Sequence, residues 1–218
     1  MIQNGEPIIV DPVLRIRTNG FLLNANISSP ENPVGLVVLA NGTTEVGEVM
    51  KGIAKHLQEL GFATSIVDLL TDQEGRLSIK GHAPRSSVPL LRSRLRLVLE
   101  EIREKVGPLP CVLVASGVAA AAAISYAALE HKGPNALVLV DGRPELARHD
   151  LRHLLPPILF VVHRIDEVLT DLNQEAFGRA MNGSKALIEV GPTEQDWKDA
   201  LQEIGAWSCQ FALKAAPE

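Results

Sequence analysis

The chain has 218 residues and contains little cysteine. Its two cysteines, Cys111 and Cys209, each lie in an apolar stretch, so a disulfide framework is not expected and a reducing compartment, the cytoplasm, is predicted. The first twelve residues contain no basic segment followed by an apolar run. The sequence therefore predicts no signal peptide.

An excess of positive charge is also absent. The chain has 21 Lys and Arg residues against 26 Asp and Glu residues, a formal net charge of -5, whereas domains that bind nucleic acid carry a basic surface. The one arginine-rich stretch, 92–103, includes Glu100 and Glu101 and is interpreted as a solvated helix face. Nucleic acid is not an expected partner.

One long apolar run is present, at 112–129, and its length is near the lower limit for a membrane span. Ser116 and Gly117 divide it into a Val/Leu-rich part and an Ala-rich part, a pattern typical of a strand that turns into a helix. No membrane association is predicted. The apolar content of 46% predicts a folded chain, and the length predicts a single domain over 1–218.

Alternating apolar residues on both sides of Asn19-Gly20 predict an antiparallel hairpin at the start of the domain. Six continuous apolar runs follow, and such runs are typical of strands buried on both faces of a parallel sheet. They lie at 35–40, 63–67, 111–115, 136–140, 158–162 and 186–190.

Between these runs, apolar residues at helical spacing predict helices at 46–60, 91–106 and 197–211, with another over the alanine run 119–123. Gly61 is the expected end of the first helix. The alternation of strands and helices predicts an α/β fold, a doubly wound and mostly parallel sheet opened by the antiparallel hairpin.

Ligands bind such sheets at the carboxyl ends of the strands. The residues expected there are 41–44, Asp68, 116–117, 141–143, 163–166 and 191–194. A phosphate loop is disfavoured, because Glu48 and Val49 follow Gly47 where such a loop needs Lys and Ser or Thr, and the acidic residues would repel phosphate. Asp68 is interpreted as a turn residue, and nucleotide binding remains the least favoured hypothesis.

Ser116 lies where the strand at 111–115 meets the alanine-rich helix. A serine on a sharp strand-to-helix turn is the nucleophile elbow of the G-x-S-x-G motif. In this chain Val114 and Val118 occupy the two glycine positions. The alternative is a serine that caps the helix.

Five segments together resemble one known family: 35–42, 67–71, Ala115-Ser116 with the alanines that follow, 141–147, and Asp166-Glu167 followed by Leu172-Asn173. Over nearly its whole length the chain resembles the dienelactone hydrolase-like branch of the α/β-hydrolase superfamily. The resemblance implies the α/β-hydrolase fold.

The resemblance also implies site residues. Ser116 would be the nucleophile and Asp166 the triad acid, although His163-Arg164 replaces the glycine that usually opens the acid loop. The oxyanion hole would use backbone N–H groups of Gly117 and of the loop Gly42-Thr43, in which Asn41 replaces the family's histidine.

The expected base is missing. The family places its histidine after the last strand, where this chain has Glu194, and all six histidines precede Asp166. Glutamate is a weaker base than histidine, but two neighbouring carboxylates raise one pKa. Ser116, Asp166 and Glu194 therefore form one candidate constellation. His163 and His82 are alternative bases.

The other histidines are expected to face solvent. His56 lies on the polar side of its helix, and His149 and His153 are four residues apart in a polar segment. A helical pair at that spacing could bind metal, but no third ligand is evident, so no metal and no cofactor are predicted.

The favoured hypothesis is an α/β-hydrolase-fold protein whose serine hydrolase activity is lost or weak and which binds a small-molecule ligand or a protein partner. The alternative is an active hydrolase of small esters, lactones or thioesters that uses Ser116 with a non-standard base. The exposed hairpin would suit a homodimer, and the sequence leaves the oligomeric state open.

Overall fold

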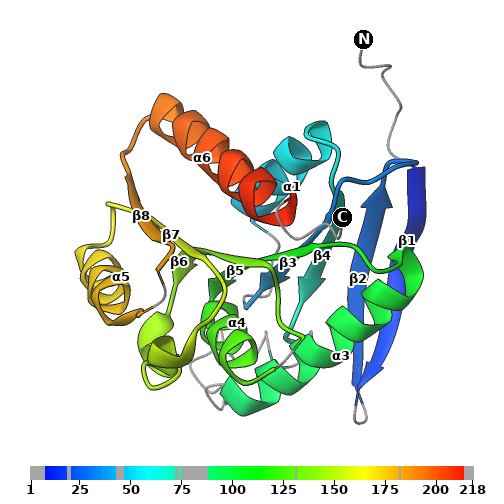
Figure 1. The fold of residues 1–218 in the computed structure, drawn as a ribbon, viewed down its shortest axis with the longest axis horizontal. Helices are drawn as coiled ribbons and strands as arrows, with labels where there is room; N and C mark the ends of the chain where they lie inside the picture. Colours follow the sequence, from blue (N-terminus) through cyan, green and yellow to red (C-terminus); the bar gives the residue numbers. More distant parts are fainter. Residues whose placement is uncertain are drawn as a thin grey trace.

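One mixed sheet runs through the protein (Figure 1). The computed structural model describes residues 8–18, 21–42, 47–71, 74, 88–130, 132–181 and 183–213. Eight strands of the described residues form the sheet in the order β1-β2-β4-β3-β5-β6-β7-β8. Their bounds are β1 Ile8–Thr18, β2 Phe21–Ser29, β3 Leu36–Asn41, β4 Ala63–Asp68, β5 Cys111–Gly117, β6 Ala136–Gly142, β7 Ile158–His163 and β8 Lys185–Val190.

The predicted hairpin and parallel sheet are both confirmed. Strands β1 and β2 pair antiparallel with Thr18 opposite Phe21, and the turn residues Asn19 and Gly20 lie outside the described residues. Strand β2 pairs antiparallel with β4, and the pairs from β4 through β3 to β8 are parallel. Each predicted strand is found, and β5, β6 and β7 extend past the apolar runs into polar residues.

Helices cover both faces of this sheet, as expected for a doubly wound fold (Figure 1). One hydrophobic core lies under α3, α4 and α5, and a second lies under α1 and α6. The bounds are α1 Glu48–Glu59, α3 Val88–Val106, α4 Val118–Leu129, α5 Glu167–Arg179 and α6 Glu194–Leu213. Short 3₁₀ helices follow β6 at Pro144–Ala147 (η1) and Leu151–His153 (η2).

Two glycines bring strand ends against the first turn of α4. A Cβ on Gly42, just after β3, would lie 2.6 Å from the backbone nitrogen of Ala119. A Cβ on Gly142, at the end of β6, would lie 2.7 Å from the Cβ of Ala120. Such contacts are too close for any other residue type. The carboxyl ends of β3 and β6 are therefore held at the N-terminus of α4.

Helix α5 was not predicted, because it shows no apolar stripe: Asn173 and Ala176 are its buried residues, and Val168 is exposed. The prediction that His56 faces solvent was wrong. Helix α6 covers the ring, and a Cβ on Gly205 would lie 2.7 Å from His56 Nε2, which is buried without a hydrogen-bond partner.

Two other expectations can be compared with the described residues. Cys111 and Cys209 are free thiols, as predicted. None of the helices in the described ranges is long and apolar enough to cross a membrane.

Candidate active site

Polar residues lie at the ends of five neighbouring strands. They are Asp68 on β4, Asn41 on β3, Ser116 on β5, Asp141 on β6 and His163 on β7. Because the carboxyl ends of parallel strands meet at one edge of a sheet, these residues form a row along that edge. The prediction placed a site at this edge, and the row is the candidate active site.

One half of the row is a chain of side-chain hydrogen bonds. The Ser116 hydroxyl donates to Asn41 Oδ1 at 3.0 Å, and Asn41 Nδ2 donates to Asp68 Oδ1 at 3.0 Å. The Asn41 side chain is buried. Its amide therefore bridges a hydroxyl and a carboxylate, and the Ser116 proton points to an amide oxygen, which is not a base.

The other half is an acid–imidazole pair. Asp141 Oδ1 accepts from the backbone N–H of His163 at 2.9 Å, and Asp141 Oδ2 lies 2.7 Å from His163 Nδ1. A carboxylate at this position favours a proton on Nδ1 and leaves the lone pair of Nε2 available. The imidazole ring of His163 also lies near the indole ring of Trp197 on α6, with ring centroids 5.2 Å apart.

The backbone of Asp141 is strained. Its φ of 46° makes it the one non-glycine residue with a positive φ in the described part of the chain. Aspartate enters this region more readily than most residues but at a cost of about 1 kcal/mol. The two hydrogen bonds with His163 hold it there, and strain of this kind is concentrated at functional sites.

The sharp turn between β5 and α4 is made by Gly117, in a conformation that would strain any other residue. Ser116 is still paired with Val140 in the sheet, whereas Gly117 has φ 54° and ψ −131°. The elbow is therefore centred one residue later than the sequence analysis placed it. The motif then becomes Ala115-Ser116-Gly117-Val118-Ala119, which has small residues at both flanking positions, and the central position has no side chain.

The predicted oxyanion groups are only partly described. Gly42 packs against the backbone of both Val118 and Ala119, and Thr43 lies outside the described residues. The first N–H groups of a helix have no acceptor within the helix. The first turn of α4 is therefore a source of donors beside Gly117.

Asp166, the predicted triad acid, is the N-cap of α5. Its Oδ1 accepts from the backbone N–H of Leu169 at 3.0 Å, and its side chain is exposed. The structure does not join Asp166 to Ser116 by a hydrogen bond. The acid that pairs with a histidine is Asp141, one strand earlier.

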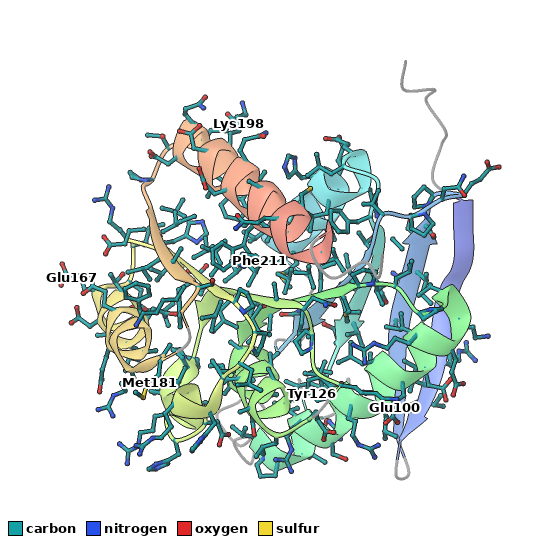
Figure 2. The ribbon with its side chains drawn as sticks, in the orientation of Figure 1. Glu100, Tyr126, Glu167, Met181, Lys198 and Phe211 are labelled. Atoms are coloured by element: carbon teal, nitrogen blue, oxygen red, sulfur yellow. The ribbon has the colours of Figure 1, made fainter. Side chains whose placement is uncertain are left out.

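Glu194, the predicted base, is the first residue of α6 and its side chain is 83% exposed. Its Oε1 lies 2.7 Å from Nζ of Lys198, and Figure 2 shows Lys198 on the outer side of α6. The hydrogen bond from Lys198 and its charge lower the pKa of Glu194, which makes this carboxylate a weaker base.

The loop that carries Glu194 serves to begin a helix. The backbone N–H of Thr193 donates to Asp196 Oδ2 at 2.9 Å, and the backbone N–H of Asp196 donates to Thr193 Oγ1 at 3.1 Å. This reciprocal pair is a capping box. The hydrogen bonds from Thr193 also lower the pKa of Asp196.

Asp141 had no predicted role, although residues 141–143 were expected at the edge of the site. The available signal was an Asp-Gly pair directly after a buried strand. The described residues contain no group of three His, Cys, Asp or Glu side chains suited to a metal ion. His149 and His153 are exposed, and His82 lies outside the described residues.

The fold is that of known hydrolases. Dienelactone hydrolase from Anabaena variabilis is 23% identical with a TM-score of 0.78, and the match covers 94% of this chain and 97% of that one. Est1E from Butyrivibrio proteoclasticus is 13% identical with a TM-score of 0.73, and the match covers 94% and 98%. The chain therefore has the α/β-hydrolase fold, as the resemblance implied. No family model matches the chain.

The sequence is also similar to putative phosphoribosyl transferases from two strains of Mycobacterium tuberculosis. Each is 30% identical over 214 residues, which cover 96% of this chain and 47% of the relative. The chain spans about half the length of these relatives.

Proposed function

We propose that this chain is an α/β-hydrolase-fold domain that binds a small molecule at the carboxyl edge of its sheet and has lost serine-dependent ester hydrolysis, fully or nearly so. The observation that carries the proposal is the conformation of Gly117. The residue with positive φ at the elbow is where the fold places a nucleophile, and here that residue is a glycine and has no side chain.

Ser116 is a poor substitute for the missing nucleophile. A serine hydroxyl attacks a carbonyl carbon only when a neighbouring base takes its proton. The Ser116 proton is directed to Asn41 Oδ1, and Glu194 is paired with Lys198 at the helix surface. Without a nucleophile–base pair, about 10³- to 10⁴-fold acceleration over water remains from binding and oxyanion stabilisation.

The edge still has the chemistry of a binding site. Ser116 and His163 offer hydrogen-bonding groups at partly exposed positions, and the indole of Trp197 gives an apolar wall beside the imidazole. A small, partly polar ligand fits such a surface.

The curated relatives that are named putative phosphoribosyl transferases are about twice as long as this chain. We assign no transferase activity to this domain, because the segment after β3 contains Glu45 and Glu48 in place of a phosphate loop. A bound ligand is therefore expected to be held by the polar row and not by a phosphate-binding turn.

A fluorophosphonate probe and a panel of short-chain aryl esters test the proposal. Wild type should remain unlabelled and should hydrolyse esters no faster than Ser116→Ala. Gly117→Ser puts a hydroxyl on the strained residue and should become labelled. Gly117→Ala is the matched control, because it introduces the same backbone strain without a hydroxyl, and it should remain unlabelled.

Circular dichroism should show that both glycine variants fold. Labelling of wild type that is lost in Ser116→Ala would overturn the proposal and support the alternative, an active serine hydrolase. Saturation transfer NMR with small carboxylic acids, esters and lactones tests binding directly. Wild type should give a signal with at least one of these classes, and the absence of any signal would contradict the binding role.

A further inference from the structure

We infer that the Asp141–His163 pair is a general base that activates water, so that the domain hydrolyses small activated esters or thioesters without a covalent intermediate. The inference rests on the proposed function, because the water occupies the space left by the missing side chain at Gly117.

The pair has the geometry that a general base requires. Both carboxylate oxygens of Asp141 contact His163, one at the backbone N–H and one at Nδ1. These two contacts fix the ring orientation and the tautomer, and Nε2 is left with its lone pair. The side chain of His163 is 22% exposed, and the proposal places a water molecule at its open part.

The cost of this arrangement argues against a purely structural pair. Asp141 is held at φ 46°, a conformation in which glycine would carry no strain. A neutral side chain with an acceptor oxygen would also satisfy the backbone N–H of His163. Trp197 packs beside the imidazole, which limits its rotation. An oriented, partly exposed acid–imidazole pair at the ligand-binding edge of the fold is a candidate for proton transfer.

The pair lies beside the elbow. Strand β6 separates β5 from β7, Gly142 is paired with Gly117, and the backbone N–H of Arg143 donates to the carbonyl of Gly117 at 3.0 Å. Two strand spacings, roughly 10 Å, separate the backbones of β5 and β7. In the proposal one water molecule bridges the imidazole and a carbonyl carbon placed over Gly117.

In the proposed step the substrate carbonyl lies over Gly117, with its oxygen toward the N–H groups in the first turn of α4. His163 Nε2 takes a proton from water, the water oxygen forms a bond to the acyl carbon, and the carbonyl electron pair moves onto its oxygen. The C–O or C–S bond to the leaving group then breaks as that electron pair returns. The leaving group takes the proton from Nε2, and the products are a carboxylic acid and an alcohol or thiol. Asp141 is the positioning residue that stabilises the imidazolium.

Hydrolysis of p-nitrophenyl acetate by the full chain tests this step. His163→Ala should lower kcat about 100-fold, within the range for general-base catalysis, and should change KM by less than twofold. Imidazole added to the buffer should restore part of the rate to His163→Ala. His153→Ala is the matched control, because His153 is exposed in η2, and it should keep the wild-type rate and show no response to imidazole.

Asp141→Asn should lower kcat and leave KM unchanged, and a structural role alone would not produce that split. Mass spectrometry of wild type during turnover should show no acyl adduct. Equal rates for wild type and folded His163→Ala, or failure of imidazole rescue, would overturn the inference and leave the proposed function standing. An acyl adduct on Ser116 would overturn both.

Discussion

The two halves of the polar row differ in chemistry, and only the first has a fully buried member, Asn41. The Ser116–Asn41–Asp68 chain is centred on a buried amide that accepts from Ser116 and donates to Asp68. The Asp141–His163 pair is partly exposed, has a strained backbone and keeps a ring nitrogen for a ligand. Buried polar groups must be satisfied and therefore stabilise the fold, whereas the open pair can take part in a reaction. One edge of one sheet thus contains a structural half and a chemical half.

The half that contains Asn41 continues beyond the row. Arg94 on α3 is buried, and its Nη1 donates to the carbonyl of Leu69, the residue after Asp68, at 2.8 Å. The same guanidinium contacts both carboxylate oxygens of Glu74, at 2.6 and 2.9 Å. The end of β4 is therefore tied to α3 by the hydrogen bond from Arg94 to Leu69, and the bidentate ion pair with Glu74 neutralises the buried guanidinium.

The largest loss of stability is expected at this ion pair. Glu74→Ala removes the carboxylate partner of a buried guanidinium and should lower the free energy of unfolding by about 3 kcal/mol, measured by urea denaturation at pH 7. Glu175→Ala removes a carboxylate from an exposed pair with Arg179 and is the control, with an expected change within about 0.5 kcal/mol.

The same pair predicts a pH dependence. The hydrogen bond from Arg94 lowers the pKa of Glu74 in the folded state, so its stabilisation is present above the unfolded pKa of about 4.3 and is lost as pH falls through the lower folded pKa. The difference between wild type and Glu74→Gln should therefore shrink on acidification below about pH 4. A constant difference from pH 7 to pH 3 would contradict this assignment.

The next effect is expected at Asn41. Asn41→Ala leaves the Ser116 hydroxyl and the Asp68 carboxylate without the bridging amide and should cost about 2 kcal/mol. Asn24 on β2 is exposed, and Asn24→Ala should cost little. If Ser116 belongs to the structural half, Asn41→Ala and Ser116→Ala should be less than additive, because both remove the same hydrogen bond. Full additivity would show that Ser116 does not contribute to stability through its hydrogen bond with Asn41.

A smaller effect is expected at Asp141, because two changes oppose each other. Asp141→Gly removes the hydrogen bonds with His163 but relieves the strain at φ 46°, so the net loss should stay within about 1 kcal/mol. Asp141→Ala loses the same bonds and keeps the strain, and it should be about 1 kcal/mol less stable than Asp141→Gly. Equal stability of the two variants would show that the backbone relaxes. Both should still lower the rate of ester hydrolysis.

The fold was predictable because strands buried on both faces have continuous apolar sequences, and each of the six apolar runs forms a strand of the parallel sheet. The site was less predictable, because hydrogen bonds between strands depend on register. Asp141 and His163 are 22 residues apart, and no local spacing indicates their contact. The serine in the elbow segment was visible in the sequence, but the choice between Ser116 and Gly117 depends on backbone angles that only the structure gives.

The smallest effect is expected at Glu194, which the sequence analysis proposed as the base. Its carboxylate is exposed and paired with Lys198, so Glu194→Gln should leave both the melting temperature and the rate of ester hydrolysis unchanged. Thr193→Ala is the contrasting variant one residue earlier, because loss of the cap on α6 should cost about 1 kcal/mol. If Glu194→Gln lowered the rate of hydrolysis tenfold while the melting temperature stayed constant, the exposed carboxylate would belong to the chemistry. The reaction would then have to be assigned to Ser116, Asp166 and Glu194 and not to the Asp141–His163 pair.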